Sequence, residues 1–309
     1  MTKVSSAVSL VEVTQDRDGQ RLDNFLTARL KGLPRSVIYR IIRTGQVRVN
    51  GGRAKPATRL ERGDIVRVPP VSIRENATGD IPPAVLKLLN QSICFETHGV
   101  MVIDKPSGMA VHGGSGLAWG VVDVVRKMRP GMKVDLVHRL DRETSGCLLL
   151  ALNGDNLREL NTQIKNDRIE KRYLCLMDGK LEQDLVHVNE PIGQFERAGQ
   201  KFMRVDPGGK PAHTTFHRLQ NLTDCSFAEA HLHTGRTHQI RVHAEHLGAP
   251  LAGDKRYSPK TRQKFWKAQG LKRMFLHAHQ ISFYTADGEQ QLVHAPLPAE
   301  LAQLLEKLE

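Results

Sequence analysis

The spacing of apolar residues changes once along the chain, and the change divides it into two regions. Between residues 19 and 76, apolar residues first recur at the three- and four-residue spacing of helices and then alternate with polar ones at 46–50 and 64–68. We therefore expect two helices followed by two strands. The first helix is predicted to end at Pro34, and the second to begin with Ser36 as its N-cap.

The larger region begins near residue 91 and is rich in short apolar runs of strand length. Residues 77–90 contain prolines that interrupt any helix, so this stretch is predicted to be a linker, and residues 1–18 a polar lead. One helix is expected over 155–165, with Asp155 as its cap. The predicted strands are 100–104, 147–152, 172–177, 214–219, 226–232 and 280–284. This pattern predicts an α+β fold with few helices, a small domain over 19–76 and a large domain over 91–309.

Charge is concentrated in the small domain. The 309 residues carry a formal charge of +12, and residues 19–70 hold twelve Lys and Arg against three Asp and Glu, a local charge of +9. Such a concentration favours contacts with phosphates, and hence a polyanionic partner. Only Phe25 and Tyr39 are aromatic in this region, which disfavours stacking on unpaired bases and favours backbone contacts with folded RNA.

The remaining composition narrows the setting. An anionic membrane surface is the competing partner, but no apolar stretch approaches the roughly 20 residues that span a bilayer. The four cysteines lack CxxC spacing, and residues 1–9 lack a secretory pattern. We expect reduced thiols and a cytoplasmic location.

The most unusual stretch is 137–146, in which Asp141 lies between Arg139 and Arg142 just before the apolar run at 147–152. Nearby cations typically lower the pKa of an aspartate by roughly 1–3 units, so an ionised side chain is expected. That state suits a nucleophile or a general base. The alternative is a polar loop with an internal ion pair. Gly146 is expected to provide a tight turn before the strand.

Other stretches carry chemistry that is ambiguous by itself. The loop 105–114 holds one lysine and one histidine, Tyr173 lies among charges at a strand start, and residues 231–246 contain five of the 14 histidines. A metal site is disfavoured because His238 and His243 are five residues apart and no cysteine pair accompanies them. No GxGxxG or GxxxxGK[ST] stretch supports a nucleotide cofactor.

Two resemblances bring these stretches together. Residues 21–26, 45–51 and 60–66 resemble the S4 RNA-binding module, which implies that the arginine-rich second helix lies against RNA backbone. Residues 138–146, 105–112, Tyr173, 235–241 and 253–254 resemble, in the same order, the motifs of the large pseudouridine synthase family that modifies ribosomal and transfer RNA. With a leading S4 module, the resemblance is to the branch acting on large-subunit (23S) ribosomal RNA.

The resemblance implies a mixed, mostly antiparallel, bent sheet with the active cleft across its middle. It implies that Asp141 is the essential carboxylate and that Arg236 pairs with it. Tyr173 is expected to face the base, Ile240 to line the pocket, and Arg139 to enter the space left by the target nucleotide. The further residues expected to contact substrate are His138, Thr144, Lys105, His112 and His238. Those expected to contact RNA from the S4-like module are Arg35, Arg40, Arg43, Arg48, Arg53 and Arg62.

The reaction implied is an isomerisation of uridine, for which no cofactor and no metal is expected. The expected partner is ribosomal RNA, either alone or within a ribosome assembly intermediate, and the expected state is a monomer without membrane contact. Whether Asp141 attacks the sugar, attacks the ring or removes a proton stays open. A glycoside hydrolase using Asp141 and Glu143 is disfavoured by the arginine between them. A non-catalytic RNA-binding or assembly protein is the other alternative.

Overall fold

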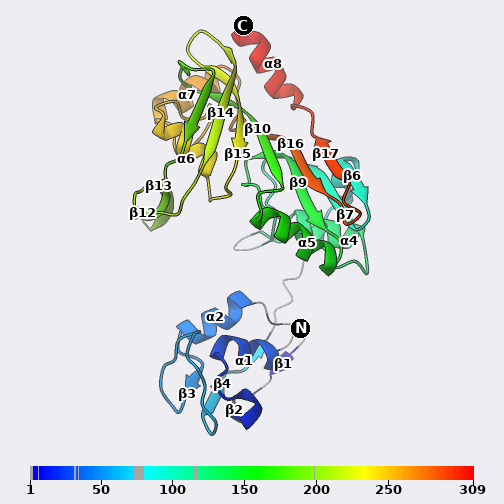
Figure 1. Cartoon of the computed structure of the whole chain (residues 1–309), viewed down its shortest axis with the longest axis vertical. Coiled ribbons are helices and arrows are strands. Elements are labelled where there is room, and N and C mark those ends of the chain that lie inside the picture. Colours follow the sequence, from blue (N-terminus) through cyan, green and yellow to red (C-terminus); the bar gives the residue numbers. More distant parts are fainter. Residues whose placement is uncertain are drawn as a thin grey trace. The chain divides into compact units, whose positions relative to one another are not determined.

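The chain forms two compact units, Met1–Asp80 and Ile81–Glu309. Figure 1 shows the elements of each unit in this computed structural model, which describes residues 3–5, 7–30, 33, 35–72, 80–113, 117–197 and 199–309. Pro34 and residues 73–79 lie outside the described residues.

The first unit packs two helices against a small sheet. Helices α1 (Leu22–Arg29) and α2 (Arg35–Arg43) share one apolar core with strand β4. The three-stranded sheet has the order β2 (Ser9–Glu12), β4 (Ile65–Val68), β3 (Arg48–Val49), and the remaining elements are β1 (Lys3–Ser5), β5 (Val71–Ser72) and the short helix η1 (Gln15–Arg17). The two predicted helices and two predicted strands are therefore present.

Their boundaries differ from the sequence prediction in three places. Helix α1 ends at Arg29, because Leu30 takes φ −96° and ψ 58°, outside the helical region. Helix α2 begins at Arg35, one residue before the expected N-cap. Strand β2 pairs with β4, although it lies in the stretch predicted to be a polar lead. The prediction missed it because its four residues contain no apolar run long enough to indicate a strand.

The second unit is built on one mixed sheet (Figure 1). Ten described strands take the order β11-β14-β15-β10-β16-β9-β7-β6, with β17 beside β16 and β8 beside β9. Their bounds are β6 (Ile93–Thr97), β7 (Val100–Lys105), β8 (Asp135–Leu136), β9 (Ser145–Ala151), β10 (Glu170–Met177), β11 (Leu185–Val188), β14 (Thr214–Asn221), β15 (Ser226–Leu232), β16 (Leu276–Tyr284) and β17 (Gln290–His294). Only the β16–β9 pairing is parallel among these strands. The α+β class and the mixed, mostly antiparallel sheet are thus confirmed. A separate hairpin joins β12 (Ile192–Arg197) and β13 (Gln200–Val205).

Strand β9 is buried on both faces, which explains its uninterrupted apolar run. Leu148 and Leu150 belong to one core, whereas Cys147 and Leu149 belong to the core on the other face. Gly146 does not make the predicted turn. It lies within β9 with φ 107°, and a Cβ atom there would stand 2.2 Å from the carbonyl oxygen of Ala278 on β16. Its role is therefore to let the two parallel strands approach.

Six helices flank the sheet in the described part of this unit: α3 (Pro83–Gln91), α4 (Val121–Met128), α5 (Gly154–Lys165), α6 (Gln239–His246), α7 (Lys260–Ala268) and α8 (Ala299–Leu308). Helix α5 is capped by Asn153, whose side chain accepts a hydrogen bond from the Asn156 amide, and not by Asp155 as predicted. Helix α3 lies in the predicted linker, yet Leu89 is fully buried in the core of this unit. Within the described segments, every helix is too short or too polar to cross a membrane.

Candidate active site

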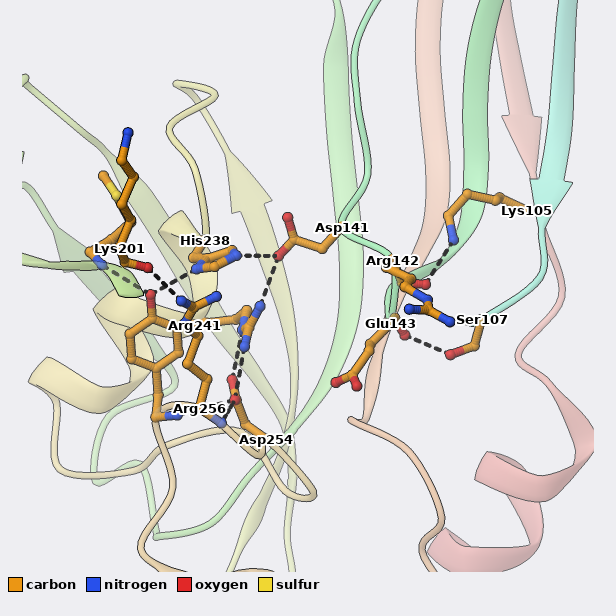
Figure 2. A network of polar contacts seen from close by, with 12 residues as sticks. Lys105, Ser107, Asp141, Arg142, Glu143, Lys201, His238, Arg241, Asp254 and Arg256 are labelled. Atoms are coloured by element: carbon orange, nitrogen blue, oxygen red, sulfur yellow. Dashed lines mark hydrogen bonds and ion pairs between the residues drawn. The ribbon is translucent and has the colours of Figure 1, made fainter. Parts of the chain in front are cut away.

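An ion pair between Asp141 and Arg241 is the centre of the site. Asp141 lies on the loop that leads from β8 into β9, whereas Arg241 lies on helix α6, 100 residues later. Arg241 Nη1 donates to Asp141 Oδ2 at 3.0 Å, and the Asp141 side chain keeps 26% of its surface exposed. The sheet thus presents a partly accessible carboxylate that is paired on one oxygen (Figure 2).

Arg241 is itself held from behind by Asp254. Its Nε and Nη2 atoms donate to the two carboxylate oxygens of Asp254 at 2.7 and 2.9 Å. Asp254 is fully buried, and the backbone amides of Arg256 and Tyr257 also donate to it. Burial alone would lower the pKa of Arg241, but the two carboxylates outweigh burial and raise it. The guanidinium is therefore a fixed, permanent cation with one nitrogen aimed at Asp141.

The predicted pairing of Asp141 with Arg236 is wrong. Arg236 Nε instead donates to the carbonyl oxygen of Pro211 at 2.9 Å. Arg236 precedes α6, in a loop organised by the side chain of Gln239, whereas Arg241 is the third residue of that helix. Sequence reasoning missed Arg241 because the two arginines share one motif. The sequence offered no signal that separates them, because Ile240 and Val242 flank Arg241 in an alternating pattern rather than at helical spacing.

His238 adds a second polar group beside Asp141. Its Nε2 lies 3.6 Å from Asp141 Oδ2, and its Nδ1 is 2.7 Å from the hydroxyl of Tyr257. That hydroxyl accepts a hydrogen bond from the Met203 amide at 3.3 Å, so its own proton is directed to His238 Nδ1. Burial lowers the pKa of His238, which favours the neutral ring. A neutral ring that accepts at Nδ1 carries its proton on Nε2 and points it at the carboxylate.

A cleft of about 490 Å³ opens beside Asp141 and is lined by Arg139, Tyr173, Leu232 and Arg236, among others. A narrower pocket continues from it and adds Ile240 and Leu276 to the lining. The lining strands β10, β15 and β16 are neighbours in the sheet order. The structure thus brings Tyr173 and Ile240 to Asp141, where the resemblance places them.

The ring of Tyr173 forms a buried wall of this cleft. Only 4% of the residue is exposed. Burial, and then the charge of Asp141, raises the pKa of Tyr173, so its hydroxyl stays protonated at neutral pH. This group can hold or relay a proton, but it is a poor phenolate base.

A third hollow of about 710 Å³ also borders Asp141 and is predominantly basic. Its lining includes Arg139, Arg142, Lys255, Arg256 and the exposed His112. Arg139 borders all three hollows. Its guanidinium has no hydrogen bond or ion pair to any residue in the described part of the chain, which leaves it available to a ligand.

Lys105 does not face the cleft as predicted. It is fully buried, and its Nζ donates to the carbonyl oxygens of Pro106, Met109 and Arg142 at 2.9, 2.9 and 3.2 Å. Burial, and then the nearby charge of Arg273, lowers the pKa of Lys105 to about 7. Figure 2 shows this lysine tying the 105–109 loop to the loop that carries Asp141.

Two further residues that were predicted to contact substrate, His138 and Thr144, instead make hydrogen bonds within the loop that carries Asp141 or with strand β9, which follows it. His138 Nε2 accepts a hydrogen bond from the Leu149 amide at 3.1 Å, and burial lowers the pKa of His138 to about 3. The Thr144 amide donates to the Asp141 carbonyl oxygen at 3.2 Å, which closes the turn. The carboxylate of Glu143 faces a cation, since its Oε1 lies 4.0 Å from Lys255 Nζ.

The histidine-rich stretch is occupied by protein contacts. His243 bonds Thr214 through Nδ1 and the Glu190 carbonyl oxygen through Nε2, and His233 stacks on His213 with ring centres 4.0 Å apart. Among the residues that the structure describes, no three His, Cys, Asp or Glu side chains are grouped closely enough to hold a metal ion.

In the first unit, three of the predicted RNA-binding arginines share one hollow, namely Arg40, Arg43 and Arg53. Arg48 lies next to them, since its Nη2 and the Arg53 side chain both border Gly45. Arg62 instead donates to the side chain of Gln15. Arg35 begins α2, and its side chain lies outside what the structure describes.

Comparisons with known proteins agree on both units. Residues 99–246 match the model of the family described as RNA pseudouridylate synthase, and residues 20–66 match that of the S4 domain. Ribosomal large subunit pseudouridine synthase C of Vibrio cholerae is 40% identical, over 100% of this chain and 99% of the relative. The protein of the same name from Escherichia coli is 41% identical, also over 100% of this chain and 99% of its own.

Solved structures give the same result for the second unit. Human RNA Pseudouridylate Synthase Domain Containing 4 matches with a TM-score of 0.60 at 25% identity, covering 73% of this chain and 95% of its own. Human RNA Pseudouridylate Synthase Domain Containing 1 matches with a TM-score of 0.59 at 27% identity, covering 74% and 97%.

Proposed function

Since this chain belongs to the RNA pseudouridylate synthase family and is an RNA pseudouridine synthase, we propose that it isomerises uridine to pseudouridine in large-subunit (23S) ribosomal RNA. The observation that carries this target is the 40% identity, over the entire chain, to a relative named for the large ribosomal subunit. The basic S4 unit supports RNA as the partner.

The chemistry fits a single carboxylate. Isomerisation breaks the N–C glycosidic bond of uridine and rejoins the sugar to C5, so nothing is oxidised or reduced. Asp141 Oδ2 is engaged by Arg241 and faced by His238, whereas Oδ1 has no hydrogen bond to any described residue. We infer that Oδ1 is the oxygen that reacts, as a nucleophile toward the sugar or ring or as a base toward a sugar proton.

The walls of the cleft supply the remaining functions. Tyr173 and Ile240 offer apolar surface to a uracil ring, and the neutral Tyr173 hydroxyl can relay the C5 proton through water. A stacked base must leave its helix first, at a cost of a few kcal/mol. Arg139 is exposed, unpaired within the described chain and beside Asp141, and we infer that it fills the gap left by the base.

The direct test is to map pseudouridines in ribosomal and transfer RNA from cells with and without the gene. One or more large-subunit sites should disappear with the gene and return with the wild-type copy, but not with an Asp141→Asn copy. Loss of transfer RNA sites alone, with every large-subunit site retained, would contradict the proposed target.

Tyr257→Phe is expected to slow single-turnover pseudouridine formation roughly 5- to 30-fold, since one hydrogen bond to an active-site group is typically worth about 1–2 kcal/mol. The variant loses the hydroxyl that donates to His238 Nδ1. RNA affinity should stay within about twofold, because the basic S4 unit is unaltered. Nitrogen NMR shifts of the His238 ring should change from one tautomer, protonated on Nε2, to a mixture.

Tyr284→Phe is the matched control, because Tyr284 lies at the end of β16 and borders none of the three hollows around Asp141. Its rate and the His238 spectrum should equal those of the wild type. An unaltered rate and tautomer in Tyr257→Phe would show that Tyr257 does not position His238.

A further inference from the structure

A hollow of about 530 Å³ lies on the surface of the first unit, far along the sequence from the catalytic loop. We call it the Tyr39 hollow. It is lined by Tyr39, Arg40, Ile42, Arg43, Arg53, Ala54, Lys55 and Pro56. These residues come from helix α2 and from the segment that follows β3, and they combine apolar groups with four cations.

The ring of Tyr39 is held in place while much of it stays open to solvent. Its hydroxyl donates to Asp23 Oδ2 at 2.8 Å, and Asp23 also accepts from Arg21 Nε and Nη2 at 3.1 and 2.8 Å. Arg21, with help from Tyr39, holds the pKa of the buried Asp23 carboxyl well below its usual range, so this anchor stays ionised. Tyr39 nevertheless exposes 41% of its surface, an unusual exposure for an aromatic side chain fixed at its far end.

Within the described residues, the cations around the ring are not paired with acidic side chains. Arg40, Arg43, Arg53 and Lys55 form no ion pair with any side chain of the described residues. The nearest acidic residue in this network, Asp23, is already engaged by Arg21 and Tyr39. The rim of the hollow is therefore positive, whereas Tyr39, Ile42, Ala54 and Pro56 provide apolar surface inside it.

We propose that the Tyr39 hollow binds one unpaired RNA nucleotide, with its base stacked on the Tyr39 ring and its flanking phosphates on the surrounding cations. Contacts with backbone alone would require the cations but not an apolar floor or an open aromatic face. Every base has a π-face, so stacking on Tyr39 would tolerate any sequence, and the flanking phosphates would match the positive rim.

This mode differs from the one that the sequence favours. The presence of only two aromatic residues in the basic region disfavours stacking, and Phe25 is indeed buried in the core at 6% exposure. The structure shows that the other, Tyr39, is the exposed one and borders the hollow. The inference rests on RNA as the partner of the proposed function, but not on any step at Asp141.

The test uses the full chain and two RNA probes, a hairpin with an unpaired loop and a blunt duplex of equal length. A 2-aminopurine in the loop reports stacking by quenching of its fluorescence. Tyr39→Leu keeps apolar bulk but removes the π-face, so we expect it to weaken hairpin binding roughly 5- to 100-fold, abolish quenching and leave duplex binding within about twofold. Tyr39→Phe keeps the ring and should retain most of the affinity and quenching.

Arg43→Gln serves as the contrasting variant. It should weaken binding of both RNA probes and lower the salt slope of binding by about one, whereas Tyr39→Leu should leave that slope unchanged. Equal weakening of hairpin and duplex by Tyr39→Leu, or no weakening of either, would overturn the stacking site. Pseudouridine formation is measured separately, so a failure of the catalytic proposal leaves the binding result interpretable.

Discussion

Asp141→Asn is expected to reduce pseudouridine formation by roughly 10³-fold or more, because the variant has no ionised oxygen to act as nucleophile or base. The amide oxygen can still accept from Arg241 Nη1, so the fold and the loop should be preserved. RNA affinity should stay within a few fold, since the basic S4 unit is unaltered. Single-turnover assays with saturating enzyme measure the first effect, and filter binding measures the second.

Glu143→Gln is the matched control, since it removes a carboxylate from the same loop. Glu143 faces Lys255 at 4.0 Å, so the rate should change by no more than about threefold. A comparable loss in both variants would favour chemistry with two carboxylates. Retained activity in Asp141→Asn would remove the basis of the mechanism.

Arg241→Gln is expected to lower both stability and rate, because Arg241 joins two carboxylates. Removing one partner of a buried pair typically costs about 3–5 kcal/mol, and here Asp254 would be left buried without its guanidinium. Asp141 would lose the donor on Oδ2, for which we expect a rate loss of roughly 10²-fold or more. Urea unfolding and single-turnover rates measure the two effects.

A double variant separates the two effects of Arg241. Adding Asp254→Asn to Arg241→Gln removes the unpaired buried charge, so a large part of the lost stability should return while the rate stays low. Arg236→Gln is the control from the same motif. Its unfolding free energy should change by less than about 0.5 kcal/mol, and its rate less than that of Arg241→Gln, since the Arg236 side chain donates to the Pro211 carbonyl oxygen and to no other described residue. A greater rate loss in Arg236→Gln would restore the original pairing.

The strands were more predictable than the helices, for a physical reason. The run 226–232 appears as β15 with the same bounds, because its residues alternate between the buried and the less buried face of the sheet, the period of two that identifies a strand. Helix α6 buries Gln239, Arg241 and His243 together with its apolar residues, so it lacks the apolar periodicity that identifies a helix. Helix α7 buries only Trp266.

The family and its branch were also predictable, because they depend on motif order. An S4 module before the synthase motifs favours the C type of the large-subunit branch, with the D type similar, and the relatives named synthase C confirm that resemblance. Contacts within the site were less accessible. Arg236 and Arg241 lie five positions apart with the same charge, and only the packing of α6 against Asp254 distinguishes them.

The position of β16 has a consequence for when the enzyme becomes competent during its synthesis. This strand lies between β10 and β9, and it joins the half of the sheet that carries Asp141 to the half that carries Tyr173 and leads into α6. Every other strand of that path precedes it in the sequence, so a nascent chain emerging from the ribosome would hold the two halves unjoined until Leu276–Tyr284 is available. Catalytic activity should therefore appear late in translation, once the strand that joins the two halves has been made.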